Sequence, residues 1–212
     1  MKAIFFDLDD VLVFSESAHN NAWRTSLSRL GVDPTLIDFE SMVGSADLRQ
    51  AEMFVERFEL SETPFQICEH KRLTFLEMTQ NGFESAAGRN ALLQYASSHF
   101  TTAVVSSSPQ TVIHRVLATE NIAHYFNFII GFEDCEKHKP HPTPYLNALK
   151  KANLTAADAL VIEDSPTGIQ ASLNAGIQVF GLLKNQRPEQ IVKDVKYFSS
   201  FTDIHNALMS VA

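Results

Sequence analysis

Short apolar segments alternate with helical segments through the second half of this 212-residue chain. Such alternation predicts a parallel sheet with helices on both faces, because each helix carries the chain back to the start of the next parallel strand. We therefore expect an α/β fold with a doubly wound parallel sheet and a crevice at the carboxyl ends of its strands. The expected strands span 102–105, 128–130, 159–162 and 177–181. One expected helix begins at Pro109, and the others span 142–151, 166–175 and 203–209.

An early strand and a long helical interval precede this alternation. Residues 3–6 form a short apolar run that ends in acidic residues, which suits a strand buried on both faces. The interval that follows has apolar residues at helical spacing, and Thr63–Pro64 supplies an N-cap followed by proline. We expect an all-α insertion at 16–85 between two core segments, 1–15 and 86–212. The residues at helical spacing are Ala22, Trp23, Leu27, Leu30, Ala51, Phe54, Val55 and Phe58.

Composition narrows the class of partner. A formal net charge of -8 without a cluster of Lys and Arg argues against a nucleic-acid surface. Cys68 and Cys135 are the only cysteines, so we expect two reduced thiols rather than a disulfide framework. The N-terminal apolar run is too short for a signal peptide, and no later segment approaches a membrane span. We expect a cytoplasmic protein, a monomer or a small homo-oligomer, that binds neither nucleic acid nor a membrane.

Four polar clusters stand where expected strands end, and a doubly wound topology brings such ends together. They are Asp7 with Asp9, Ser106 with Ser107 and Ser108, Lys139, and Glu163 with Asp164. Carboxylates from two strands, without a set of His or Cys, favour a hard cation such as Mg²⁺ over zinc. An anionic nucleophile near a phosphate meets repulsion of about 4 kcal/mol per charge pair at about 4 Å and an effective dielectric of about 20. A cation and Lys139 can offset this repulsion.

The spacing Asp7-x-Asp9 indicates a division of roles. Residues two apart in a strand-end loop can point to a common side, so Asp7 can attack phosphorus while Asp9 protonates the leaving oxygen and later activates the acceptor. Ser106 can donate a hydrogen bond to a phosphoryl oxygen, and the backbone at the start of the helix after Pro109 can support the same anion. We interpret Ser108, just before Pro109, as the N-cap of that helix.

The same residue types also have ordinary structural roles. An acidic pair after a strand is common at turns, and Glu163 with Asp164 can simply favour the dipole of the helix that follows them. His138 and His141 flank Lys139, but without further His or Cys nearby they do not indicate a zinc site. We prefer the catalytic interpretation because all four clusters occupy matching positions.

These clusters resemble the motifs of the haloacid dehalogenase superfamily, a group of aspartate-nucleophile phosphotransferases. The first motif is similar to Phe6-Asp7-Leu8-Asp9-Asp10-Val11-Leu12, the second to Val105-Ser106-Ser107, the third to Lys139-Pro140, and the fourth to Val161-Ile162-Glu163-Asp164-Ser165-Pro166-Thr167-Gly168-Ile169. Their order and spacing cover nearly the whole chain. The fourth motif is the most specific, because composition hardly explains an acidic pair followed by Ser-x-x-Gly-Ile.

The resemblance implies a Rossmann-like core, a helical cap inserted after the first motif, and an aspartyl-phosphate intermediate on Asp7. It also implies Mg²⁺ held by the Asp7 side chain, the Asp9 backbone carbonyl and Asp164, with Glu163 as a further or supporting partner. The phosphate-binding roles fall on Ser106, Ser107 and Lys139. The second acid, Asp9, favours phosphatases and phosphomutases over the dehalogenases of the superfamily, which lack it.

Within the superfamily, the chain is most similar to the β-phosphoglucomutase and sugar-phosphate phosphatase group. His19 and Trp23 fall in the first cap helix, where that group often has His and Trp, and Lys71 falls near a cap lysine that faces the substrate. We therefore expect His19 and Lys71 to be substrate-facing cap residues. The cap loop of that group commonly reads Val-Gly-Arg or Val-Ser-Arg, whereas Val43-Gly44-Ser45 has no Arg, and Arg49 follows one turn later.

The predicted function is that of a magnesium-dependent phosphatase acting on a small phosphorylated metabolite, with a sugar phosphate favoured. The alternative is a sugar phosphomutase of the β-phosphoglucomutase type. A phospho-acceptor signalling domain also combines a doubly wound sheet, an acidic pocket, a Ser or Thr and a Lys. It is disfavoured because such domains are much shorter and their acidic pair precedes the acceptor Asp by a whole strand and helix.

Overall fold

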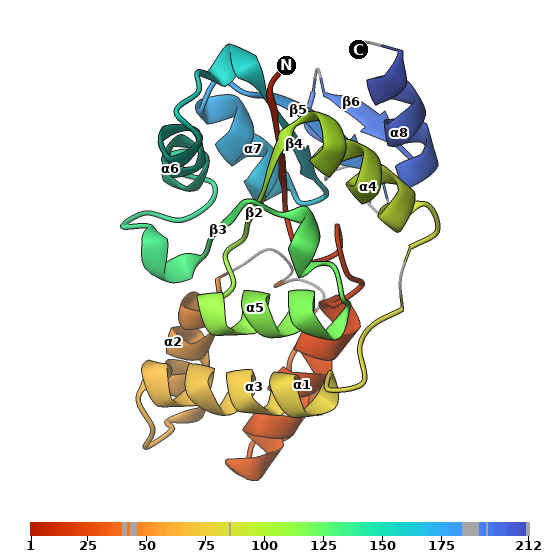
Figure 1. Ribbon diagram of the computed structural model, residues 1–212. Helices are drawn as coiled ribbons and strands as arrows, with labels where there is room; N and C mark the ends of the chain where they lie inside the picture. The colour runs from red at the N-terminus through yellow and green to blue at the C-terminus, as the bar shows by residue number, and fades with distance from the viewer. Residues whose placement is uncertain (40–41, 43–45, 85, 184–190, 194, 211–212) are drawn as a thin grey trace. The chain divides into compact units, whose positions relative to one another are not determined.

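The computed structural model describes residues 1–39, 42, 46–84, 86–183, 191–193 and 195–210. The chain divides into two compact units (Figure 1). Unit 1 joins Met1–Phe14 to Phe83–Ala212, and unit 2 is the continuous segment Ser15–Gly82. The sequence places a core-to-cap boundary at 15/16 and 85/86, and the division of function between core and cap stays a prediction.

A six-stranded parallel sheet forms the centre of unit 1. Its strands are β1 (Ala3–Phe6), β2 (Thr101–Val105), β3 (Phe128–Ile130), β4 (Ala159–Glu163), β5 (Gln178–Leu182) and β6 (Lys196–Phe198). They lie in the order β3-β2-β1-β4-β5-β6, so the chain winds outward on both sides of β1. The switch point of the sheet therefore lies at the carboxyl end of β1, between β2 and β4.

Helices cover both faces of this sheet. They are α4 (Arg89–His99), α5 (Gln110–Thr119), α6 (Thr143–Ala152), α7 (Pro166–Asn174) and α8 (Phe201–Met209). Figure 1 shows α6 and α7 on one side of the strands, and α4 and α8 on the other. This arrangement confirms the expected α/β fold with a doubly wound parallel sheet.

The first strand is buried on both faces, as its apolar run predicts. Each of its residues, Ala3 to Phe6, has 0% of its surface exposed. Successive side chains of a strand point to opposite faces. Phe5 joins Tyr145 of α6, Val161 of β4 and Ile169 of α7 in one core cluster, which fixes the carboxyl end of β1 against both neighbouring strands.

Unit 2 contains helices and, among its described residues, no strand. Its elements are α1 (Glu16–Arg29), a 3₁₀ turn (Pro34–Leu36), α2 (Asp47–Phe58) and α3 (Pro64–Met78). Its core includes Trp23, Phe54 and Ile67. Thr63 caps α3 through a capping box with Gln66, which confirms the helix start expected at this position. In the described part of both units, no helix is long and apolar enough to cross a membrane.

One α-helix and one strand of the described part of unit 1 are not predicted by the sequence. Helix α4 buries Leu92, Leu93 and Ala96, but it begins after Gly88, whose φ is 84° and which has no side chain to cap the helix. The usual polar start signal is therefore missing. Strand β6 has three residues and an exposed Lys196, too short for an alternating pattern to stand out.

Candidate active site

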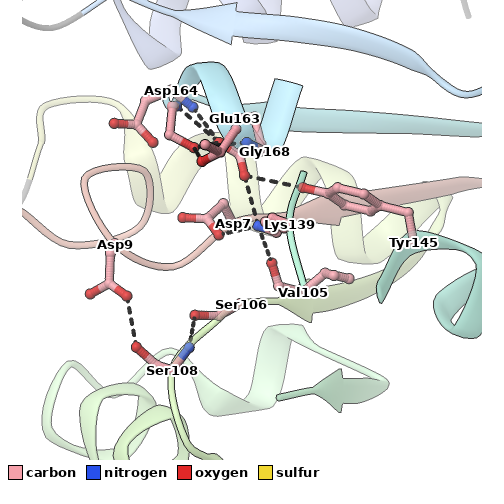
Figure 2. Close-up of polar contacts among 12 residues, drawn as sticks. Asp7, Asp9, Val105, Ser106, Ser108, Lys139, Tyr145, Glu163, Asp164 and Gly168 are labelled. Atoms are coloured by element: carbon pink, nitrogen blue, oxygen red, sulfur yellow. Dashed lines mark hydrogen bonds and ion pairs between the residues drawn. The ribbon is translucent and has the colours of Figure 1, made fainter. Parts of the chain in front are cut away.

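Residues from four segments meet at the switch point of the sheet. Asp7 follows β1, Ser106 follows β2, Glu163 is the last residue of β4, and Asp164 comes next. Because β1 lies between β2 and β4, the parallel register brings these positions to one edge. Lys139, from the segment before α6, joins them (Figure 2). The structure thus brings the expected residues of the core motifs together.

Lys139 is the centre of the polar network. Its Nζ donates to Asp7 Oδ1 at 2.6 Å, to Glu163 Oε1 at 2.7 Å and to the Val105 carbonyl at 2.9 Å. Its side chain is only 5% exposed. Burial lowers the pKa of the Lys139 ammonium, but Asp7 and Glu163 outweigh burial and hold this pKa well above its ordinary value. Lys139 therefore remains charged, and all three of its protons have acceptors.

Glu163 is held on both of its carboxylate oxygens. Oε1 accepts hydrogen bonds from Lys139 and from the Tyr145 hydroxyl at 3.2 Å. Oε2 accepts from the backbone N–H of Asp164, and from the backbone N–H and the hydroxyl of Ser165, each at 3.0 Å. The Ser165 hydroxyl also caps α7 by accepting from the Gly168 N–H. Glu163 is fully buried, so this set of donors fixes its position.

Three carboxylates form a compact acidic cluster. Asp7, Glu163 and Asp164 each present an oxygen, and these oxygens lie within 4.8 Å of one another. Burial raises the pKa of Asp7 well above its ordinary value, against the effect of Lys139, and Glu163 and Asp9 add to the increase. Burial also raises the pKa of Asp164, and Glu163 and Asp7 act in the same direction. One lysine does not balance this charge, and the all-oxygen donor set fits a hard divalent cation.

The segment after β2 carries two serines with distinct contacts. The Ser108 hydroxyl donates to Asp9 Oδ2 at 2.9 Å, and the Ser108 N–H donates to Ser106 Oγ at 3.0 Å (Figure 2). Ser106 is buried, whereas Ser107 is exposed. The N-cap of α5 is Pro109, so the interpretation of Ser108 as that N-cap is wrong. The reason is that the Ser108 hydroxyl points to Asp9 instead of the helix.

The start of α5 also differs from the expectation that its backbone supports an anionic ligand. The Gln110 N–H donates to Glu133 Oε2 at 2.9 Å, and the Gln110 side chain donates to Asp134 Oδ2 at 2.7 Å. Acids of the chain itself thus occupy the position that favours negative charge at this helix. Ser106 is the better candidate for a hydrogen bond to a phosphate, and Lys139 for electrostatic stabilisation of its negative charge.

The cap residues expected from the sequence meet within unit 2. Lys71 Nζ lies 2.7 Å from His19 Nδ1, and it donates to both oxygens of Asp47 at 2.8 and 2.9 Å. A lysine ammonium only donates, so His19 Nδ1 accepts and the proton of the neutral ring is on Nε2. The Lys71 side chain is 3% exposed, and the His19 ring stacks on Phe75. Asp47 compensates the charge of Lys71.

The cap loop Val43-Gly44-Ser45 lies outside the described residues. Arg49, the residue that follows it by about one turn, lies in α2 and is exposed. The contribution of this loop to substrate choice stays a prediction.

Sequence reasoning missed two partners of the expected residues. Tyr145 binds Glu163, and its ring lies 5.1 Å from Lys139 Nζ, yet in the sequence it is one apolar residue of a helical pattern. Asp47 binds Lys71, yet an acid in the first turn of a helix is common for the helix dipole alone.

The fold and the acidic cluster define an α/β enzyme with a site at the switch point of its sheet. The chain belongs to the haloacid dehalogenase-like hydrolases, the family that matches residues 4–182. It is an enzyme of the phosphatase and phosphotransferase class within that family.

Two relatives illustrate how far the similarity extends. The chain is 26% identical over 188 residues to a phosphorylated carbohydrates phosphatase of Thermotoga maritima, and the match covers 86% of both chains. It is 35% identical over 103 residues to PpaX of Caldanaerobacter subterraneus. That second match covers 44% of this chain and 47% of the relative, so it spans about half the length of each protein.

Solved structures share the fold. CbbY from Rhodobacter sphaeroides, in complex with phosphate, has a TM-score of 0.86 and 19% identity, with 96% of each chain covered. A β-phosphoglucomutase from Clostridium difficile has a TM-score of 0.78 and 24% identity, with 99% of each chain covered. At these identities the likeness concerns the fold alone.

Proposed function

We propose that this chain is a magnesium-dependent phosphatase that releases phosphate from a small phosphorylated metabolite through an aspartyl-phosphate on Asp7. The observation that carries this proposal is the contact of Asp7 with Lys139 in the same cluster as Asp164. A carboxylate nucleophile needs positive charge nearby to approach an anionic substrate, and it needs a fixed direction of attack. The family membership of the chain supports the same reaction class.

Asp7 and Asp9 divide the chemistry in this proposal. An oxygen of Asp7 attacks phosphorus as the bond from phosphorus to the substrate oxygen breaks, and Asp9 gives its proton to that oxygen. Asp9 then takes a proton from water, whose oxygen attacks phosphorus and releases phosphate from Asp7. Asp9 is two residues from Asp7 in the same strand-end loop, and Ser108 holds its carboxylate. A positioned acid and base of this kind typically contributes about 10²–10⁴-fold to the rate.

Phosphate binding falls to Lys139 and to the turn at Ser106 and Ser107. Lys139 remains charged beside Asp7, so it can stabilise negative charge on the transferring phosphoryl group. Ser106 Oγ accepts a hydrogen bond from the Ser108 N–H, which leaves its hydroxyl proton to donate to a phosphoryl oxygen. Ser107 lies in the same turn and is exposed.

Mg²⁺ would be held by the carboxylates of Asp7 and Asp164, with the Asp9 carbonyl as the family resemblance implies. When bound, it supplies positive charge that offsets repulsion between the acids and the substrate phosphate. Glu163 supports this site by holding Lys139 and the Asp164 backbone, because protein donors already occupy both of its oxygens. Such outer partners orient ligands without contacting the metal themselves.

The proposed substrate is a sugar phosphate. The support is the similarity over 86% of the chain to a relative named as a phosphorylated carbohydrates phosphatase. We further propose that unit 2 is the cap that selects the substrate. In unit 2, His19 would contact the substrate, while Lys71, whose protons are all in use, would act by holding His19.

A phosphate-release assay with Mg²⁺ and a broad panel of sugar phosphates tests the proposal. We expect turnover by the wild-type protein, none by Asp7→Asn, and wild-type turnover by Glu56→Gln, which changes an exposed acid on α2. Reduction of the reacting enzyme with borohydride should convert an aspartyl-phosphate to an alcohol at residue 7, detectable by mass spectrometry. A folded protein that is inert on the whole panel, or an active Asp7→Asn variant, would rule the proposal out.

Product analysis in the same assay separates the alternative, a sugar phosphomutase. A mutase would convert β-glucose 1-phosphate to the 6-phosphate when primed by the bisphosphate, because a sugar hydroxyl replaces water as the acceptor. We expect free phosphate and no isomerised product. Isomerisation without phosphate release would replace the phosphatase assignment by the mutase one.

A further inference from the structure

Asp9 has a hydroxyl partner that comes from another strand end. The Ser108 Oγ lies 2.9 Å from Asp9 Oδ2, although the two residues are far apart in the sequence. The pair joins the loop after β1 to the turn after β2 (Figure 2). The hydroxyl has no capping role at α5, because the N-cap there is Pro109. The contact with Asp9 is therefore the interaction that the Ser108 side chain contributes.

The backbone of Ser108 is fixed on both sides. Its N–H donates to Ser106 Oγ at 3.0 Å, and its carbonyl accepts from the Phe132 N–H at 3.0 Å. The following residue is Pro109, which restricts the backbone conformation of Ser108. A hydroxyl on such a rigid turn can hold a partner in one orientation at little further entropic cost.

The loop that contains Asp9 is also held by backbone hydrogen bonds. The Asp10 N–H donates to the Val13 carbonyl at 2.7 Å, and the Leu12 N–H donates to the Leu8 carbonyl at 2.8 Å. The Asp9 side chain remains partly exposed. With the loop closed on itself, the Ser108 hydroxyl limits rotation of the Asp9 side chain.

We propose that Ser108 is a positioning residue, which holds the Asp9 carboxyl group in the orientation needed for proton transfer to the leaving oxygen. This role rests on the proposed function, in which Asp9 exchanges that proton. A hydroxyl suits the task because it can donate to a carboxylate oxygen and can also accept from a carboxylic acid. The same partner therefore serves Asp9 before and after it has given up its proton.

The bond changes define which substrates depend on Ser108. In the first step an Asp7 oxygen bonds to phosphorus, the bond to the leaving oxygen breaks, and the Asp9 proton moves to that oxygen. A sugar alkoxide is a poor leaving group and needs this proton. A p-nitrophenolate is stable as an anion near neutral pH and leaves without it. Loss of Ser108 should therefore affect the two substrate classes differently.

The test compares kcat/KM for a sugar phosphate and for p-nitrophenyl phosphate in the presence of Mg²⁺. This parameter reports on steps up to departure of the leaving group, so it excludes the later attack of water, which also uses Asp9. For Ser108→Ala we expect a loss on the order of tenfold or more on the sugar phosphate. On p-nitrophenyl phosphate we expect less than about a threefold change, which also shows that the variant is folded. A burst of p-nitrophenolate should appear if the water step becomes limiting.

Matched variants separate positioning from structural effects. Ser108→Thr keeps a hydroxyl and should retain the sugar-phosphate activity, while Ser108→Gly should behave like Ser108→Ala. Ser98→Ala removes an exposed hydroxyl on α4 and should change neither activity. Asp9→Asn should show the same selective loss as Ser108→Ala, but a larger one.

The outcomes distinguish this role from the proposed function. An equal loss on both substrates in Ser108→Ala would assign Ser108 to phosphate binding or to the fold, and no loss on the sugar phosphate would leave it without a role in the reaction. Either result overturns the positioning role while the phosphatase assignment stands. A wild-type protein that turns over neither substrate would overturn the phosphatase assignment and, with it, the role of Ser108.

Discussion

Gly168 leaves the space that the Glu163 carboxylate fills. A Cβ atom at Gly168 would lie 1.6 Å from Glu163 Oε1, far inside any van der Waals contact. Glu163 cannot simply turn aside, because it is fully buried and both of its oxygens hold hydrogen bonds. The glycine in the first turn of α7 is therefore required by the acid at the end of β4.

Gly168→Ala should destabilise the protein and slow turnover. The added methyl group must displace the Glu163 carboxylate and, through it, Lys139, at a cost of about 1–3 kcal/mol in the free energy of unfolding. Urea denaturation measures the first effect, and phosphate release measures the second. Gln170→Ala, at an exposed position of the same helix, is the control. Wild-type stability together with wild-type turnover in Gly168→Ala would show that the two residues do not compete for this space.

Tyr145 contributes both a hydroxyl and a ring to the same network. Tyr145→Phe removes the hydrogen bond to Glu163 Oε1 but keeps the ring that lies 5.1 Å from Lys139 Nζ. We expect a loss of about 1 kcal/mol in the free energy of unfolding for Phe. Tyr145→Leu removes the ring as well and should cost about 2–4 kcal/mol, because it also leaves a cavity. Equal costs for the two variants, measured by urea denaturation, would mean that the ring does not contribute.

Asp164 should control the affinity for Mg²⁺. Asp164→Asn removes one of the two carboxylate ligands that we propose, so the Mg²⁺ concentration for half-maximal activity should rise at least about tenfold. Chelation by EDTA should abolish wild-type activity, and added Mg²⁺ should restore it. Glu56→Gln is the control for a lost acid elsewhere. An unchanged Mg²⁺ dependence in Asp164→Asn would remove Asp164 from the ligand set.

The sequence predicts five of the six described strands, all except β6, and the polar residues at the ends of β1, β2 and β4. A strand buried on both faces is a continuous apolar run, and the chemistry of the site stands directly after such runs at Asp7, Ser106 and Glu163. Parallel topology then brings these ends together without any need to know the side-chain contacts. The apolar runs and the parallel topology of the sheet are therefore sufficient to predict which residues at the strand ends lie close together.

The sequence does not predict the contacts between side chains in these sites. Ser108 and Asp9, Tyr145 and Glu163, and Asp47 and Lys71 each join elements that are distant in the sequence. Their pairing depends on how particular helices and turns pack, which no spacing along the chain reveals. Ser108 illustrates the limit: the local rule for a serine before a helix favours a cap, but a carboxylate on the neighbouring strand end is the stronger partner.

The Lys71–Asp47 pair in unit 2 should respond asymmetrically to mutation. The Lys71 side chain is 3% exposed, whereas the Asp47 side chain is 40% exposed. Asp47→Ala leaves a buried ammonium without its carboxylate, at a cost of up to about 3–5 kcal/mol. Lys71→Met leaves a carboxylate that water can reach, so its cost should be smaller. Urea denaturation of both variants and of the double variant shows which substitution lowers the free energy of unfolding more. A larger loss for Lys71→Met than for Asp47→Ala would contradict the burial argument.

Cys68 should be an unusually unreactive thiol in the folded protein. Burial raises the pKa of Cys68 from 9.0 to about 12, and Asp47 adds to the increase while Lys71 opposes it. Because the thiolate is the nucleophile, its fraction near pH 8 falls by about a thousandfold.

The Cys135→Ser variant leaves Cys68 as the only cysteine, so its rate of reaction with iodoacetamide can be followed alone. The matched control is the same variant unfolded in urea, which should react far faster at the same pH. The folded state favours the neutral thiol, so ionisation of Cys68 does not reduce the free energy of unfolding below about pH 9. As the pH rises from about 9 toward about 12, the thiol ionises more readily in the unfolded chain, and the protein loses stability. Similar rates in the folded and unfolded protein would show that the unit 2 environment does not suppress ionisation of this thiol.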